Sequence, residues 1–159
     1  MTKMPENEIE DKYKELRKKF KLPEFKEIDL EFEISDVEEI TFLLRSIIRR
    51  IAEKLDFYAT LLEEILQPDA SNLYAMHETR FFDENEKDKM YNLYRKLMDY
   101  SRQSIIAALE HIEKNEAEFI NNFFNEWKII KQELLGYIKV MQVSWQTESD
   151  IKEDLRYLG

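Results

Sequence analysis

Apolar residues between positions 36 and 66 recur at alternating steps of four and three. The stripe that they form consists of Leu44, Ile48, Ile51, Leu55, Tyr58, Leu62 and Ile65. This spacing puts the side chains on one face of an α-helix, where they can pack against a neighbouring element. Ser35 and Glu38 have the spacing of a capping box just before the stripe, and Pro68 follows it. The pattern predicts a long helix over about 36–66.

A second stripe of the same period follows Asn115. Its members are Ile120, Phe123, Trp127, Ile130, Leu134, Tyr137 and Met141. Asn115 and Glu118 have the spacing of a variant capping box. We therefore predict another long helix, over about 115–146.

The segment 84–112 also has helical spacing, with Asp83 as the N-cap residue and Glu86 three residues later. Its apolar face is predicted to contain Met90, Leu93, Tyr94, Leu97, Met98, Ile105, Leu109 and Ile112. The second half of this helix also carries the small residues Ser101, Ser104, Ala107 and Ala108. We interpret them as positions that receive bulky side chains of the following helix, and a ligand cavity is the alternative interpretation.

The two ends of the chain show weaker helical patterns. A charged helix is predicted over about 5–20, and a short amphipathic tail is predicted at 147–159. The expected fold class is all-α: an up-down bundle of three long helices with short N- and C-terminal helices and an extended arm near 22–34. We expect one domain, organised as an N-terminal helix and arm at 1–35, the bundle at 36–146 and the tail.

Residues 28–34 alternate strictly between apolar and acidic side chains. On a β-strand, Leu30, Phe32 and Ile34 would share one face and would be candidate interaction residues. No second segment alternates comparably, so such a strand would pair across a homodimer or extend a partner's sheet. Two intramolecular alternatives remain open: an extended segment that covers the bundle, and a short helix that starts near Pro23.

Residues 67–82 interrupt the helical pattern with a connection longer than most helix–helix loops. The candidate interaction residues here are Tyr74, His77, Arg80, Phe81 and Phe82. Their composition resembles that of a protein interface, or of a pocket that could bind a small ligand. The preferred interpretation is structural: a short helix that starts near Ser71, with the two phenylalanines tucked into one end of the bundle.

The composition excludes several classes of site. The chain has 159 residues, no Cys, 2 His and 2 Gly, which excludes disulfides and thiolate chemistry and disfavours glycine-rich phosphate loops. Neither His77 nor His111 has the neighbours that a di-iron or zinc motif requires, so both are expected to be surface or boundary residues. We predict no catalytic, cofactor or metal site.

The formal net charge of −10 disfavours nonspecific binding to nucleic acid. One compact basic cluster, made of Arg45, Arg49, Arg50 and Lys54, stands against this trend. It could bind an anion or an RNA phosphate, or it could form pairs within its helix, such as Arg49 with Glu53.

The sequence shows no secretory signal and no apolar run long enough to cross a membrane, and it lacks cysteine, so we expect a cytoplasmic protein. The most economical hypothesis is a protein–protein interaction, assembly or regulatory subunit without catalysis. Its partner would be another protein or a second copy of the chain in a homodimer. An enzyme or ligand-binding bundle with a pocket near 67–82 is the first alternative, and a nucleic-acid-associated protein is the second.

Overall fold

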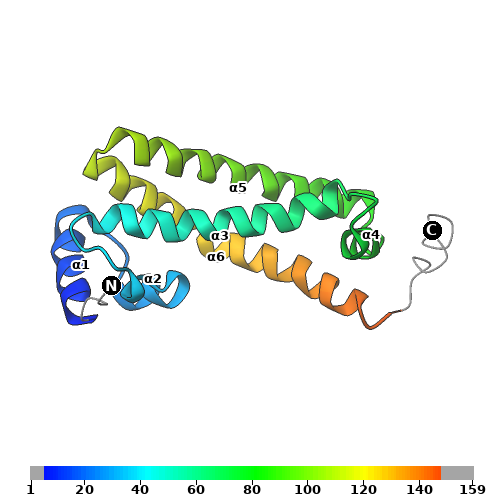
Figure 1. The fold of residues 1–159 in the computed structure, drawn as a ribbon, viewed down its shortest axis with the longest axis horizontal. Helices are drawn as coiled ribbons and strands as arrows, with labels where there is room; N and C mark the ends of the chain where they lie inside the picture. Colours follow the sequence, from blue (N-terminus) through cyan, green and yellow to red (C-terminus); the bar gives the residue numbers. More distant parts are fainter. Residues whose placement is uncertain (1–5, 148–159) are drawn as a thin grey trace. The chain divides into compact units, whose positions relative to one another are not determined.

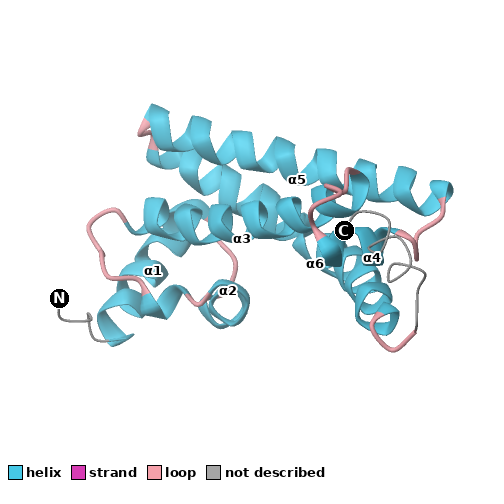
Figure 2. Cartoon of the chain, turned by 45° about the vertical axis from the view of Figure 1, so that its right-hand side comes forward, coloured by secondary structure: helices cyan, strands magenta, loops and turns pink. Residues whose placement is uncertain are grey.

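A computed structural model describes the backbone of residues 6–147, in which helices are connected by loops and no strand occurs (Figures 1 and 2). The elements, in chain order, are α1 (Glu6–Phe20), α2 (Phe25–Phe32), the 3₁₀ helix η1 (Ile34–Asp36), α3 (Leu43–Leu66), α4 (Leu73–Thr79), α5 (Glu84–Glu110) and α6 (Glu113–Ser144). The all-α prediction is therefore confirmed for these residues. The predicted C-terminal tail, apart from Thr147, lies outside the described residues.

The chain divides into two compact units. Unit 1 comprises the chain up to Asp56 together with Met98–Lys128, and unit 2 comprises Phe57–Leu97 and the chain from Ile129 onward. Each of α3, α5 and α6 therefore contributes one part to each unit.

The core of unit 1 is an aromatic cluster centred on Phe123, a fully buried residue of α6. Its ring centroid lies 5.6 Å from that of Phe32, 5.3 Å from that of Tyr100 and 5.5 Å from that of Trp127. Each of these large side chains contributes about 1.5–3 kcal/mol by leaving water. The cluster thus joins α2, α5 and α6 into one packed core.

Side chains from the long helices cap the C-terminal ends of the short N-terminal helices. Asn121 Nδ2 donates a 3.1 Å hydrogen bond to the carbonyl oxygen of Phe20 at the end of α1. Lys54 Nζ donates to the carbonyl oxygen of Glu31, and Arg50 Nη2 donates to that of Asp36 at 3.2 Å. These donors satisfy carbonyl groups that a helix end leaves without a partner, and the two cations also complement the negative end of the helix dipole.

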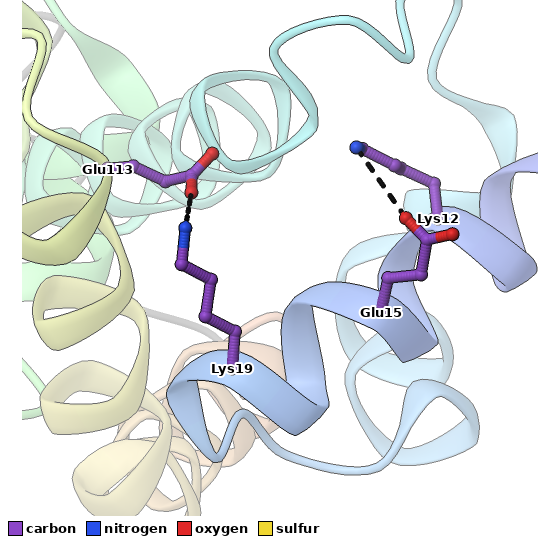
Figure 3. A network of polar contacts seen from close by, with 4 residues as sticks. All are labelled: Lys12, Glu15, Lys19 and Glu113. Carbon is purple, nitrogen blue, oxygen red and sulfur yellow. Dashed lines mark hydrogen bonds and ion pairs between the residues drawn. The ribbon is translucent and has the colours of Figure 1, made fainter.

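An ion pair connects α1 to the first turn of α6. Lys19 Nζ lies 3.3 Å from Glu113 Oε1, and a second pair joins Lys12 and Glu15 along α1 (Figure 3). Both pairs are largely exposed to solvent, so each contributes at most about 1 kcal/mol. The position of α1 therefore depends mainly on its buried residues Ile9, Tyr13 and Leu16.

The prediction of an extended arm near 22–34 is wrong, because residues 25–32 form α2 and residues 34–36 form η1. The helix alternative is the one that the structure contains. Ile28 and Phe32, four residues apart, are buried on one face of α2, whereas Leu30 is 81% exposed. Because Ile28 and Phe32 are four residues apart, the same alternation also puts them on one face of a helix. The structure contains that helix, and its period determines which side chains are buried.

Predicted helix starts differ from the observed ones in α3 and α6. Helix α3 begins at Leu43, and Ser35 lies in η1, where its N–H donates a 2.7 Å hydrogen bond to Asp29 Oδ1. Helix α6 begins at Glu113, so Asn115 lies inside its first turn. The capping box predicted at Asp83 and Glu86 is confirmed, because each side chain accepts a hydrogen bond from the other's main-chain N–H.

In unit 2, the short helix predicted within residues 67–82 is confirmed as α4. Its N-cap is Asn72 rather than Ser71, and the Asn72 side chain accepts from the N–H of Ala75. Thr79 Oγ1 donates a 2.7 Å hydrogen bond to the carbonyl oxygen of Ile65, which ties the end of α4 to the end of α3. Phe82 is buried, with its ring centroid 6.1 Å from that of Tyr137 on α6.

Candidate functional site

The second half of α5 buries three of its small residues and exposes several of its large ones. Ser101, Ser104 and Ala107 are buried. Ile105 is 47% exposed, Leu109 is 74% exposed and Ile112, in the connection between α5 and α6, is 47% exposed. The prediction that these three apolar residues face the core is therefore wrong.

The reason lies in the helical period. The buried positions of α5 are Met90, Leu93, Leu97, Tyr100, Ser104 and Ala107, at alternating steps of three and four. After Met98, our prediction assigned the large apolar residues to the buried face. In the structure, the buried positions after Met98 keep the same period and include small residues. Ser101, Ser104 and Ala107 are buried, as the packing interpretation requires, whereas Ala108 is exposed.

A groove lies between the first half of α3 and the second half of α5, within unit 1. Its volume is about 360 Å³. The residues that line it are Arg45, Ile48, Arg49, Ala52, Ser104, Ile105, Ala108, His111 and Glu116. We call it the α3/α5 groove. The name α5 ridge is used for the exposed apolar residues Ile105, Leu109 and Ile112, of which Ile105 lines the groove.

Charged groups lie at one end of this apolar groove. Glu116 is 4% exposed and accepts a 3.1 Å hydrogen bond at Oε2 from Arg45 Nε. The Arg45 guanidinium also lies 4.3 Å from the ring centroid of Phe42. Within the described residues, the side chains of Arg49 and His111 form no hydrogen bond or ion pair. The groove therefore offers an apolar floor together with cationic and imidazole groups that have no partner in this part of the chain.

The basic cluster predicted on α3 is divided by the fold. Arg50 and Lys54 cap η1 and α2, and Arg45 pairs with Glu116, so three of the four cations have intramolecular partners. The ion pair considered between Arg49 and Glu53 is not formed. Arg49 instead lines the α3/α5 groove and also a second, more polar cavity of about 500 Å³.

The candidate residues of the 67–82 segment have separate environments. The Tyr74 hydroxyl donates a 2.8 Å hydrogen bond to Glu64 Oε1, and Arg80 is exposed. His77 is 4% exposed, so the expectation of a surface or boundary residue is wrong. Its ring lies 2.9 Å from the carbonyl oxygen of Ser144 through Nε2, and 4.1 Å from the Trp145 ring between centroids. The buried imidazole thus joins α4 to the end of α6.

Two neighbours complete this contact in unit 2. The ring centroid of Phe81 lies 5.2 Å from that of His77, and Trp145 Nε1 donates a 3.1 Å hydrogen bond to Glu78 Oε2. Burial raises the pKa of Glu78 above its ordinary value, although the hydrogen bond from Trp145 and the nearby His77 act in the opposite direction. These contacts account for His77 and Phe81 as structural residues of unit 2.

The candidates in the N-terminal segment are mostly core residues. Phe32 and Ile34 are buried, and only Leu30 is exposed. Among the described residues, no group of three or more His, Asp or Glu side chains could hold a metal ion. No helix in the same part of the chain is both long enough and apolar enough to cross a membrane.

Sequence reasoning missed the α5 ridge as a surface and did not connect Glu116 with Arg45. The signal for the ridge was present, because Ile105 and Leu109 depart from the three-four period that runs through Leu97 and Tyr100. The Arg45–Glu116 pair joins residues 71 positions apart, and no local pattern indicates it. No protein-family model, curated protein sequence or solved structure matches this chain.

Proposed function

We propose that this protein is a non-catalytic protein–protein interaction module, acting as an adaptor, assembly subunit or regulator. The surface that docks the partner is the α3/α5 groove together with the α5 ridge. The observation that carries the proposal is that Ile105, which lines the apolar groove, is 47% exposed, and that Leu109, four residues later on the same face of α5, is 74% exposed. Contiguous exposed apolar side chains next to polar groups are typical of protein docking surfaces.

The energetics support this assignment. Each large aliphatic side chain left in water forgoes about 1–2 kcal/mol of burial free energy. Small side chains occupy the buried positions of the same helix at Ser104 and Ala107. Large apolar residues are also exposed elsewhere, as at Leu30 and Phe57, so the feature that distinguishes this surface is the position of Ile105 in the groove lining.

The remaining expectations form part of the same proposal. We propose that the three long helices form an up-down bundle that presents the groove, and the cytoplasmic location stays a prediction. The separate environments of Tyr74, His77 and Arg80 do not favour a ligand pocket in the 67–82 segment. The intramolecular bonds of Arg50 and Lys54 likewise leave little of the α3 cluster for nucleic acid.

Site-specific photocrosslinking in the cells that produce the protein tests this function. A photoreactive p-benzoylphenylalanine replaces Leu109 in one variant and Leu30 in a matched control. Leu30 is 81% exposed and Leu109 is 74% exposed, so both positions tolerate the bulky group and are equally accessible. We expect position 109 to give a discrete protein adduct that position 30 does not give.

Three results would contradict the proposal. The first is the absence of any adduct at position 109, and the second is the same adducts at both positions. The third is a small molecule or an RNA retained by the purified protein in native mass spectrometry and lost from a Leu109→Ser variant, which would assign the groove to a ligand.

A further inference from the structure

We propose that a second surface of unit 1, a groove between α5 and α6, binds a basic segment of a partner protein. Two adjoining cavities form this groove, with volumes of about 410 and about 300 Å³, and Gln103 and Asn122 line both of them. We call it the α5/α6 groove. It shares no lining residue with the α3/α5 groove, so this proposal goes beyond the proposed function and can fail independently of it.

The charged side chains that line the α5/α6 groove all carry the same sign. Asp99 and Glu126 line one cavity, Glu110 and Glu118 line the other, and neither lining includes a lysine or an arginine. Within the described residues, Asp99, Glu110 and Glu118 form no ion pair. The hydrogen bond that Asp99 accepts, at 2.8 Å, comes from the neutral amide of Gln103. The groove therefore presents negative charge that a cationic partner can neutralise.

The hydroxyl of Tyr100 lies in this negative environment. It donates a 2.6 Å hydrogen bond to Glu126 Oε1. Burial raises the pKa of the hydroxyl above its ordinary value, and the hydrogen bond to Glu126 and the negative charges of Glu126 and Asp99 raise it further. The two carboxylates of this cavity thus act on the buried tyrosine that lines it as well as on groups in solvent.

The acidic cavities follow one another along a single face of α5. Asp99, Gln103, Ile106 and Glu110 line them at steps of four, three and four, which keeps these residues on one side of the helix. At the helical rise, Asp99 and Glu110 lie about 16 Å apart along the axis. Ile106 lies between them and is 54% exposed. An occupant that fits this arrangement has cationic side chains at both ends and an apolar side chain between them.

Other classes of occupant fit the α5/α6 groove less well. Asp99, Glu110, Glu118 and Asn122 are exposed, so the groove is too open to enclose a small amine, whereas ligand pockets bury most of their ligand. Nucleic acid and an anionic membrane would be repelled by the carboxylates. A second copy of the chain would bring the same carboxylates together across a two-fold axis. A basic protein segment is favoured both by the groove and by the net charge of −10.

Binding of synthetic peptides to the full chain, measured by fluorescence anisotropy at low and at high salt, tests the proposal. The basic peptide has about 18 residues, with lysines and arginines around central leucines, and the control peptide replaces every lysine and arginine with glutamate. The groove variant Asp99→Asn/Glu118→Gln removes one carboxylate from each cavity. The control variant Asp88→Asn/Glu63→Gln makes the same two kinds of substitution at exposed positions that line neither cavity.

We expect the basic peptide to bind, with an affinity that falls as salt rises, and the glutamate peptide not to bind. The groove variant should bind the basic peptide about fivefold more weakly than the wild type, because it loses two partly exposed ion pairs. The control variant has the same net charge as the groove variant and should change the affinity by less than about twofold. Ile106→Ser should weaken the peptide about threefold, because it removes apolar contact.

Equal weakening by the groove variant and the control variant overturns the proposal, because binding would then depend on net charge alone. A basic peptide that does not bind overturns it as well. Spermine serves as the small-molecule probe: if it binds as tightly as the peptide and loses as much affinity in Asp99→Asn/Glu118→Gln, the groove binds a polyamine and not a protein segment. The function proposed for the α3/α5 groove is decided separately, by the crosslinking at position 109.

Discussion

Replacing Arg45 with methionine tests how the charged end of the groove is stabilised. Arg45 Nε donates a 3.1 Å hydrogen bond to the Glu116 carboxylate. The Glu116 side chain is 5% exposed and that of Arg45 is 29% exposed. The variant therefore removes the counter-charge of a buried carboxylate and leaves that carboxylate where water has little access.

The expected magnitude follows from the position of the pair. Breaking a fully buried pair by removing one partner costs about 3–5 kcal/mol. Because the groove admits water on the Arg45 side, we expect about 2–3 kcal/mol for Arg45→Met. Glu116→Met should cost only about 1 kcal/mol, since the guanidinium can turn to solvent and keeps its contact with the Phe42 ring. The double variant Arg45→Met/Glu116→Met should lie within about 1 kcal/mol of the wild type, because it leaves no unpaired charge.

Urea unfolding followed by tryptophan fluorescence gives the four free energies of this double-mutant cycle. For a chain of this size, the loss in Arg45→Met corresponds to a melting temperature lowered by about 4–12 °C. The exposed Arg95→Met on α5 is the control and should change stability by less than about 0.5 kcal/mol. The reasoning is refuted if Arg45→Met is as stable as the control, or if the double variant loses the sum of the two single losses.

Two further predictions concern single positions elsewhere. Burial raises the pKa of Glu78, so the stabilisation by its protonated form is present below the ordinary glutamate pKa and is lost as pH rises through the raised value. Glu78→Gln should therefore have a slightly higher melting temperature than the wild type at pH 7 and the same melting temperature in acid, as calorimetry across pH would measure. A difference independent of pH would contradict this assignment. Glu33 is the C-cap of α2 and has a φ of 53°, a backbone conformation that strains a residue with a β-carbon. Glu33→Gly should therefore raise the free energy of unfolding, measured by urea titration, by about 0.5–1 kcal/mol. An unchanged or lower free energy of unfolding would argue against strain at this cap.

The sequence predicts the central parts of the helices more accurately than the residues at which they begin and end. Periodic apolar residues identified the bodies of α3, α5 and α6, because burial of one face dominates a long helix. Helix ends depend on caps, and here the residues with left-handed φ are Lys21, Glu33 and His111 rather than glycines. A chain with 2 Gly lacks the usual C-cap signal, so tertiary contacts rather than local preference determine where its helices stop.

Residues 28–34 show how a short pattern admits two periods. An alternation of seven residues puts Ile28 and Phe32 on one face of a strand, and the same two residues are also four apart on one face of a helix. The cap that Lys54 provides at the Glu31 carbonyl favours the helix, as does the Trp127 Nε1 hydrogen bond to the Glu31 carboxylate at 3.0 Å. Both contacts come from distant parts of the chain, so the local sequence could not distinguish the two structures.

The sequence analysis identified residues of the candidate groove but did not predict which of the α5 residues are exposed, for a related reason. Consecutive residues on a helix are separated by about 100°, so the core position 104 and the exposed position 105 point in clearly different directions. Ser104 is buried and Ile105 is 47% exposed. The hydroxyl of the buried serine donates a 2.5 Å hydrogen bond to the carbonyl oxygen of Ser101. The isoleucine outside has no comparable role within unit 1, and its place beside Arg49 and the groove is what a partner's apolar face would require. The same departure from the three-four period that made the core prediction fail is therefore the sequence feature that coincides with the proposed docking surface.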